Sequence, residues 1–168
     1  MTDSDAPAPL PTAPRWLADA MLGRLARYLR FLGHDTAYVR GEDDASVARR
    51  AREEGRTLLT RDRALAKSVD GSLLLESPDL SDQLREVHRA YPQAGWSVAF
   101  VRCSLCNARL VPWAAPPPDA WPDEVPRDLV QRGLEIFQCP ACGQRYWEGS
   151  HTRRIRRQVE QWVGPMAP

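Results

Sequence analysis

Residues 15–33 read Arg15-Trp-Leu-Ala-Asp-Ala-Met-Leu-Gly-Arg-Leu-Ala-Arg-Tyr-Leu-Arg-Phe-Leu-Gly33. The apolar run at the start of this stretch predicts a short buried strand over residues 15–18, which ends at Asp19. Leucines then recur at helical spacing, and Gly33 stands where a helix would stop. These leucines are Leu22, Leu25, Leu29 and Leu32.

The same alternation of strand and helix continues to about residue 91. We expect strands over residues 36–39, 57–60 and 73–75. Helices are expected from Asp43 or Asp44 to Gly55, around residues 64–66, and after Ser77-Pro78, which would supply the cap and first residue of the fourth helix. Short apolar strands that alternate with helices are typical of a mainly parallel sheet covered on both faces. The sequence therefore predicts an α/β domain over residues 15–98.

Four cysteines form two matched pairs, Cys103-Ser-Leu-Cys106 and Cys139-Pro-Ala-Cys142, and the chain has no others. Four thiolates in two short knuckles can converge on one tetrahedral Zn²⁺. Asn107 and Gly143 follow the pairs, and both residue types tolerate the backbone angles that turn amides towards sulfur. Since four sulfurs leave no open position for water, we expect this zinc to be structural.

Two alternatives exist for these cysteines. Two disulfides would suit a secreted chain, but the N-terminus has neither the basic start nor the apolar run of a signal peptide. A thioredoxin-like redox pair would need only one such knuckle, near a strand-to-helix turn. Structural zinc is therefore the favoured interpretation, with redox or disulfide use as the alternative.

We expect residues 99–150 to form a zinc ribbon around the cysteines, entered by a strand over residues 96–101. Residues 134–138 predict one ribbon strand, and its hairpin partner would contain Tyr146 and Trp147. A proline-dense segment between the knuckles excludes a helix or a central strand and indicates an exposed loop. Its prolines are Pro112, Pro116, Pro117, Pro118, Pro122 and Pro126.

The two ends of the chain have contrasting patterns. Residues 1–14 hold four prolines among small and polar residues, which indicates a disordered lead-in. Residues 151–163 predict a basic amphipathic helix, with Ile155, Val159 and Trp162 on its apolar stripe. Its other faces carry Arg153, Arg154, Arg156 and Arg157.

The composition of the 168 residues fits one ordinary globular domain and a small second one. Hydrophobic residues make up 43% of the chain, yet no apolar stretch approaches the roughly 20 residues needed to span a bilayer. We therefore expect a cytoplasmic protein without a membrane partner. A net charge of +1 indicates that any attraction to nucleic acid comes from local patches.

Aspartates follow each of the first three predicted strands. Asp19 ends the first, Asp43 and Asp44 open the helix after the second, and Asp62 follows the third. The carboxyl ends of parallel strands share one edge of a sheet, where ligands gather. Carboxylates there favour a hard cation, Mg²⁺ or Mn²⁺, with Asp19, Asp44 and Asp62 as ligands. Each acid also has a structural interpretation, because aspartates cap helices and form turns.

Basic side chains near these acids are candidates for contact with phosphate groups. Arg61 adjoins Asp62, and Arg24 lies on the first predicted helix. Arg27 and Arg30 lie on the same helix, and we expect both to be solvated. We expect His34, which follows the helix stop, to be a surface or capping group.

The strings that carry these acids and cysteines resemble the Mut-seven C-terminal RNase domain family. The resemblance extends over about residues 15–162. In the first half it rests on Asp19-Ala-Met-Leu-Gly-Arg-Leu-Ala-Arg-Tyr-Leu-Arg30, Gly33-His-Asp-Thr36, Asp43-Asp44 and Gly55-Arg-Thr-Leu-Leu-Thr-Arg-Asp-Arg63. In the second half it rests on Arg102-Cys-Ser-Leu-Cys106, Cys139-Pro-Ala-Cys-Gly143 and Tyr146-Trp-Glu-Gly-Ser-His151.

This resemblance implies a PIN-like nuclease domain with three α/β/α layers, joined to a zinc ribbon and a C-terminal helix. Nucleases of the PIN type use clustered acids to bind divalent metal ions and to cut RNA. Position by position, Asp19, Asp44 or Asp43, and Asp62 take the roles of those acids. A further acid that such sites often contain has no match in this sequence.

The leading hypothesis is a metal-dependent endoribonuclease, in which water bound to Mg²⁺ or Mn²⁺ attacks a phosphodiester. The ribbon and the arginine-rich tail would bind the RNA backbone, more weakly as salt rises. The alternative is a noncatalytic RNA- or protein-binding module. A third reading, a phosphoacceptor domain, needs an aspartate and a distant lysine, which Asp62 and Lys67 match poorly.

Overall fold

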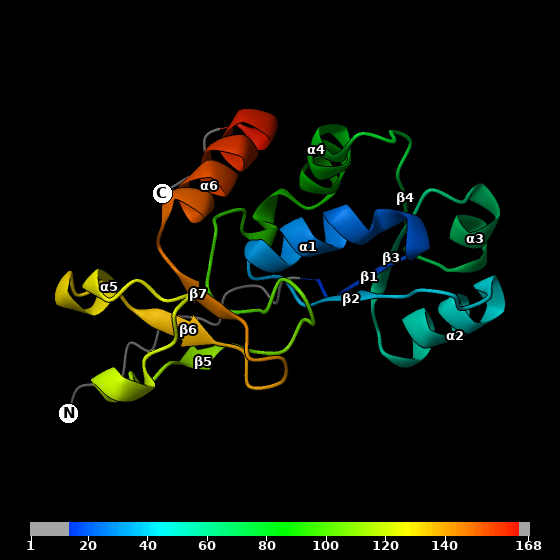
Figure 1. Cartoon of the computed structure of the whole chain (residues 1–168). Coiled ribbons are helices and arrows are strands. Elements are labelled where there is room, and N and C mark those ends of the chain that lie inside the picture. The colour runs from blue at the N-terminus through cyan, green and yellow to red at the C-terminus, as the bar shows by residue number, and fades with distance from the viewer. Residues whose placement is uncertain (1–13, 165–168) are drawn as a thin grey trace, which may run out of the picture.

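The computed structural model describes residues 14–164, so the predicted lead-in lies outside the described residues except for Pro14 (Figure 1). Its larger part is built on a parallel sheet in the order β2-β1-β3-β4. The strands are β1 (Trp16–Ala18), β2 (Thr36–Tyr38), β3 (Thr57–Thr60) and β4 (Leu73–Leu74). Each strand precedes a helix in the chain, which confirms the predicted alternation and the mainly parallel sheet.

Helices lie on both faces of this sheet. Trp16 and Ala18 face one buried cluster, while Leu17 faces the other, because successive side chains of a strand point to opposite sides. The first cluster lies beneath α1 (Gly23–Phe31), α4 (Leu80–Ala90) and α6 (Ser150–Val163), and the second beneath α2 (Asp44–Glu53) and α3 (Arg63–Ser68). A 3-10 turn, η1 (Ala20–Leu22), links β1 to α1, and another, η2 (Pro92–Ala94), follows α4.

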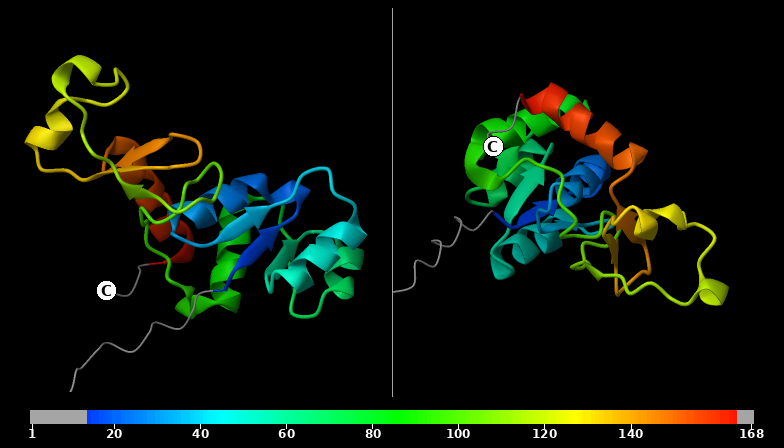
Figure 2. Two further views of the ribbon diagram at one scale, coloured as in Figure 1. Left: turned by 90° about the horizontal axis from the view of Figure 1, so that it is seen from below. Right: turned by 90° about the vertical axis from the view of Figure 1, so that its left-hand side faces the viewer.

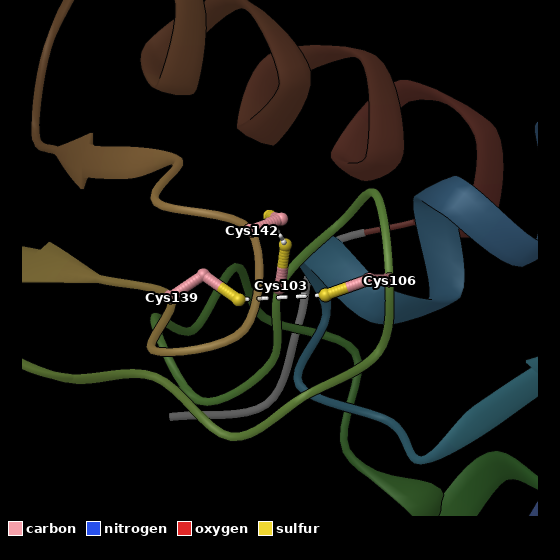
Figure 3. Close-up of side chains that lie close together, drawn as sticks. All are labelled: Cys103, Cys106, Cys139 and Cys142. Carbon is pink, nitrogen blue, oxygen red and sulfur yellow. Dashed lines mark hydrogen bonds between the residues drawn. The ribbon is translucent and has the colours of Figure 1, made fainter.

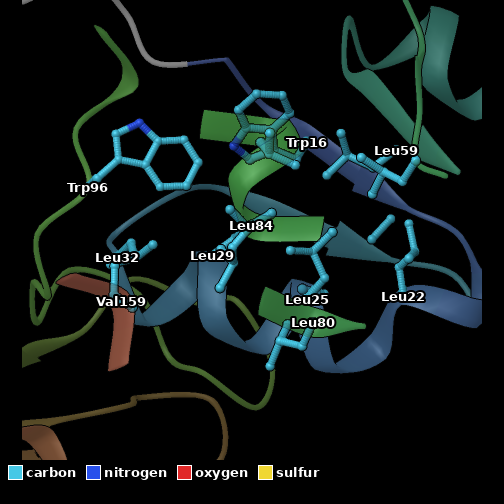
Figure 4. Close-up of a cluster of buried hydrophobic side chains, with 14 of the residues drawn as sticks. Trp16, Leu22, Leu25, Leu29, Leu32, Leu59, Leu80, Leu84, Trp96 and Val159 are labelled. Carbon is cyan, nitrogen blue, oxygen red and sulfur yellow. The ribbon is translucent and has the colours of Figure 1, made fainter. Parts of the chain in front are cut away.

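The first buried cluster contains residues from both ends of the chain (Figure 4). Trp16 of β1, Leu29 of α1 and Leu84 of α4 are fully buried in it. Ile155 and Val159, on the apolar stripe predicted for the tail, join the same cluster from α6. The last helix therefore packs back onto the first domain.

Two glycines end helices as the sequence predicts. Gly33 has φ +84° after α1, and Gly55 has φ +59° after α2. In the first case the Gly33 amide donates to the carbonyl of Arg30, and the next amide donates to the carbonyl of Leu29. These bonds form a Schellman motif, which requires the left-handed conformation that glycine adopts without strain.

A second, antiparallel sheet lies to one side of the first (Figure 2). Its strands, in the order β5-β6-β7, are β5 (Val111–Pro112), β6 (Ile136–Gln138) and β7 (Arg145–Trp147). Tyr146 pairs with Phe137, so the predicted hairpin is confirmed. Pro112 lies on an edge strand, where a missing amide is tolerated. The prediction that this segment contains no helix is wrong, because Pro118 lies in the first turn of a 3-10 helix, η3 (Pro118–Ala120), where a missing amide is tolerated. A short helix, α5 (Asp128–Gln131), follows the last of the prolines.

One predicted strand and the predicted start of one helix are wrong. Residues 96–101 form no strand, because Trp96 is buried in the first cluster and the Ala99 amide donates to the carbonyl of Phe31 at the end of α1. The fourth helix begins at Leu80 rather than Pro78. Ser77 instead forms a turn, in which its hydroxyl accepts from the amide of Asp79.

Two polar residues expected at the surface are buried. Arg30 is 7% exposed and His34 is 3% exposed. His34 lies between the rings of Trp16 and Trp96, at centroid distances of 6.2 and 5.5 Å. Burial lowers the pKa of His34 to about 4, so its imidazole is neutral near pH 7. Within residues 14–164, no helix has the length and apolarity to cross a membrane.

Candidate functional site

Asp19 lies at the carboxyl end of β1, in the middle of the acidic edge that the sequence predicts. The side chain is only 6% exposed. Its Oδ1 accepts from the Met21 amide at 2.9 Å, and its Oδ2 accepts from the Thr60 hydroxyl and, at 3.3 Å, from the Arg61 amide. These partners satisfy a buried carboxylate and hold it in one orientation.

Asp62 lies at the end of the neighbouring strand and is joined to Asp19 through Thr60. The Thr60 hydroxyl donates to Asp19 and accepts from the Asp62 amide at 2.9 Å. The Asp62 carboxylate itself caps α3, because its Oδ1 accepts from the amides of Ala64 and Leu65. Asp62 is exposed, so its other oxygen remains accessible.

Asp43 and Asp44 stand beyond the end of β2, on the other side of β1. Asp43 caps α2, with its carboxylate bound to the amide and hydroxyl of Ser46 at 2.9 and 3.0 Å. These bonds lower the pKa of Asp43. Asp44 is the first residue of α2 and lines an open hollow between α2 and α3.

The strand order β2-β1-β3 therefore places all four aspartates at one edge of the sheet. Their side chains are not gathered into a ready metal site. Within residues 14–164, the only group of three or more potential metal-binding His, Cys, Asp or Glu side chains that lie close together is the cysteine cluster. The helix-capping interpretation is confirmed for Asp43. Asp62, for which the sequence suggested a turn, also caps a helix.

The four cysteine sulfurs lie within 4.8 Å of one another. Figure 3 shows the four side chains close together, two from each knuckle. Two close approaches join the knuckles, Cys103 to Cys142 at 3.5 Å and Cys106 to Cys139 at 3.4 Å. A disulfide would need about 2.05 Å, whereas a tetrahedral zinc with Zn–S bonds of about 2.3 Å has sulfurs about 3.8 Å apart. The cluster is thus suited to a metal ion and is not a pair of disulfides.

The two knuckles have the same backbone geometry. Cys103 donates its amide to the carbonyl of Ala108, and Cys139 donates its amide to Gln144, at 2.8 and 2.9 Å. Asn107 and Gly143 return their amides to the carbonyls of the first cysteine in each knuckle. Both have positive φ, +69° and +77°, as the sequence predicts for these turns.

Tyr146 supports the cluster from strand β7, a role that the sequence analysis did not anticipate. Its hydroxyl lies 3.2 Å from the Cys103 sulfur and accepts from the Ser104 amide at 3.0 Å. Burial would raise the pKa of Cys103, but hydrogen bonds from this hydroxyl and from knuckle amides lower it to about 6. The available sequence signal was the position of Tyr146 on the hairpin strand that follows the second cysteine pair.

The first knuckle is bonded directly to the parallel-sheet domain. Arg30 donates from Nη1 to the carbonyls of Ser104 and Leu105, at 3.3 and 2.9 Å. Asn107 accepts from the amide of Thr36 at 3.0 Å and donates to Asp35 at 2.8 Å. These directional bonds, which are buried or part-buried, fix the knuckle against α1 and β2.

Asp35 forms salt bridges with arginines where the first knuckle meets the parallel-sheet domain. Arg56 lies 2.8 Å and Arg102 3.2 Å from its carboxylate oxygens. Burial raises the pKa of Asp35, but the hydrogen bonds from Arg56 and Asn107 outweigh it and lower the pKa to about 2. Asp35 therefore remains ionised and bridges the two parts of the chain.

The arginines predicted to bind nucleic acid differ in their surroundings. Arg24, Arg153, Arg154 and Arg157 are exposed. Arg156 forms two hydrogen bonds with Glu148, at 3.0 and 2.9 Å, and is not available in the same way. Arg61 is half-buried, with its amide on Asp19.

A family model described as Mut7-C RNAse domain matches residues 14–159, which is most of the chain. No curated protein and no solved structure gives a match. The matched span includes the acidic edge, both cysteine knuckles and most of α6.

Proposed function

Since the chain belongs to the Mut7-C RNAse domain family, we propose that it is a metal-dependent endoribonuclease that hydrolyses RNA phosphodiester bonds. The observation that carries this proposal is the shared edge, where Asp43 or Asp44, Asp19 and Asp62 follow three adjacent parallel strands. In this reading residues 15–98 are a PIN-like nuclease domain and residues 99–150 a zinc ribbon. The C-terminal helix over residues 151–163 packs against the nuclease domain.

The donor set at this edge consists of carboxylate oxygens, which fit Mg²⁺ or Mn²⁺ rather than a softer ion. Asp19, Asp44 and Asp62 would hold the ion, with Asp43 as the alternative to Asp44. When bound, such an ion activates water and stabilises the departing oxygen of a phosphodiester. Asp19 is fixed by Thr60 and the Met21 amide, so it would act as the rigid ligand.

The two other carboxylates are exposed and can reorient without unfolding a helix. Asp62 uses only Oδ1 for its two cap bonds, and Asp44 makes no cap bond. Because these three carboxylates are not gathered in the described residues, binding one cation would require their side chains to move together.

The cysteine cluster would hold a structural zinc in the same proposal. Four sulfurs complete a tetrahedron, so this ion would stabilise the fold and take no part in hydrolysis. Zinc-ribbon and tail residues would contact RNA, together with Arg24 and Arg61.

The alternative is a noncatalytic RNA- or protein-binding module. The observation that favours it is that Asp43 and Asp62 already cap helices. The two functions differ in one measurement, which is RNA cleavage in Mn²⁺.

The experiment measures cleavage of a single-stranded RNA in Mn²⁺ and in EDTA, using the whole chain and its Asp19→Asn and Asp62→Asn variants. We expect cleavage only with the metal, and a loss of about 100-fold or more in each variant, the scale seen when a charge-stabilising group is removed. Asp123→Asn, at an exposed position in the proline-dense segment, is the matched control and should cleave normally. Equal cleavage by the wild type in EDTA would eliminate the carboxylate-metal mechanism.

A further inference from the structure

Two adjoining hollows form one groove between α1, the start of α6 and the hairpin of the second sheet. Their volumes are about 300 and 220 Å³. Arg27, Phe31 and His151 line both hollows, so the two lie side by side. None of the sequence-based expectations includes this groove.

The walls of the groove are cationic. Arg24, Arg27 and Arg154 line it, and among the residues that the structure describes no Asp or Glu lines either hollow. Over residues 14–164, none of these three arginines forms a salt bridge with a carboxylate. Arg145 also lines the groove but is paired with Glu124. Three unneutralised guanidinium groups in one groove attract a polyanion.

Aromatic rings lie between these charges. Arg27 stands over the ring of Phe31 at 5.9 Å, and His151 meets the same ring edge-on at 6.0 Å. Trp147 and Phe100 line the end of the groove that lies beside the hairpin. Alternating cations and flat apolar rings suit a flexible strand that has both phosphates and bases.

The course of α1 gives the groove a direction. Arg24, Arg27 and Phe31 are spaced i, i+3 and i+7 and so share one face of the helix. The helix starts just after Asp19 at the acidic edge, and it ends where Arg30 contacts the first knuckle. Nine helical residues extend about 13 Å, so this face leads from the acidic edge to the cysteine cluster.

We propose that this groove binds single-stranded RNA and delivers it to the acidic edge. Arg24, Arg27 and Arg154 contact backbone phosphates, and a base packs on the Phe31 ring. The inference rests on the proposed nuclease function, which it extends by assigning the path of the substrate. An acidic peptide lacks the stacking bases that the aromatic rings would accommodate.

Arg27 and Arg154 are the main evidence for this proposal. The sequence analysis expected Arg27 only to be solvated. The two positions are more than a hundred residues apart in the chain, yet both line the smaller hollow. Arg157, one helical turn beyond Arg154, lines neither hollow. The basic tail is therefore divided into a face that serves the groove and a face that does not.

Binding is measured by fluorescence anisotropy of a labelled single-stranded RNA oligonucleotide in EDTA, so that cleavage plays no part. We expect the Arg27→Glu/Arg154→Glu variant to bind at least tenfold more weakly than the wild type. The plot of log affinity against log salt has a negative slope, and its magnitude should decrease by about 1.4, which is about 0.7 for each of the two lost phosphate contacts. The control variant is Arg49→Glu/Arg89→Glu, which makes the same charge change at exposed positions on α2 and α4. Its affinity should stay within about twofold.

Three outcomes would overturn the groove: unchanged affinity in the Arg27/Arg154 variant, an equal loss in the control, or full displacement of RNA by a glutamate-rich peptide. If the glutamate pair fails to fold by circular dichroism, Arg27→Gln/Arg154→Gln provides the same test with a smaller loss. Cleavage in Mn²⁺ separates the two proposals. A wild type that binds through the groove but never cleaves refutes the nuclease and leaves the groove standing.

Discussion

Arg30 donates a hydrogen bond of 2.9 Å from Nη1 to the carbonyl oxygen of Leu105, inside the first cysteine knuckle. The same guanidinium donates from Nε to the carbonyl of Thr36 at 2.8 Å. One buried side chain therefore joins α1, β2 and the cysteine cluster. The parallel-sheet domain and the cysteine cluster are therefore held together by direct hydrogen bonds.

Replacing Arg30 by Met should destabilise the whole chain. The change leaves the buried carbonyls of Thr36 and Ser104 and the part-buried carbonyl of Leu105 without their charged donor, which is expected to cost about 2–4 kcal/mol. The free energy of unfolding is measured in urea. Arg49→Met, at an exposed position on α2, should change it by less than about 0.5 kcal/mol. Equal stability of the two variants would show that the Arg30 contacts carry little energy.

Replacing Cys139 by Ser should remove the metal from the cysteine cluster. We expect about one zinc per wild-type chain and near none in the variant, measured by elemental analysis of protein purified without added metal. Because Arg30 and Asn107 tie the knuckle to α1 and β2, the variant should also melt at a lower temperature throughout, including the first domain. A wild type without zinc would reject the zinc assignment.

Replacing Tyr146 by Phe should weaken metal binding while leaving the fold intact. The variant keeps the buried ring but loses the hydroxyl that contacts the Cys103 sulfur. Loss of such a supporting bond typically lowers metal affinity by about 10- to 100-fold. Competition with a chromogenic chelator measures the change. Tyr38→Phe, which loses a hydroxyl far from the cysteines, is the control and should match the wild type.

The burial of His34 predicts a pH dependence of stability. Its pKa is lowered from 6.5 to about 4 in the folded chain, so the unfolded chain binds more protons between these values. Its contribution is complete above about pH 6.5 and is lost as the pH falls towards 4, by about 3 kcal/mol in total. Unfolding free energies of the wild type and His34→Leu, measured across this range, should differ in slope. Parallel curves for the wild type and His34→Leu would mean that His34 is protonated without penalty.

Much of the parallel sheet could be predicted because local patterns agree with the fold. The strand over residues 57–60 is found as predicted, and Gly33 and Gly55 end their helices by adopting positive φ. Apolar runs and glycine stops act within a few residues, so a single sequence contains them. The meeting of the cysteines followed from spacing alone.

The misplaced residues depend on partners that are distant in sequence. In the sequence, Arg30 resembles a solvated helix residue. In the fold it is buried because the carbonyls of Ser104 and Leu105 lie beside it and accept its hydrogen bonds. The apolar run of residues 96–101 resembles a strand, but in the described part of the chain no strand pairs with it, and Trp96 packs in the core instead. His34 is buried for a related reason, because Trp16 and Trp96 enclose it.

The packing of α6 onto α4 has a consequence for how the chain matures on the ribosome. Ile155 and Val159 fill the same cluster as Trp16 and Leu84, although translation makes them last. Until α6 leaves the exit tunnel, the part of the first buried cluster that it covers therefore stays exposed. A nascent chain that stalls before residue 155 would present this exposed surface to chaperones and to other unfinished chains.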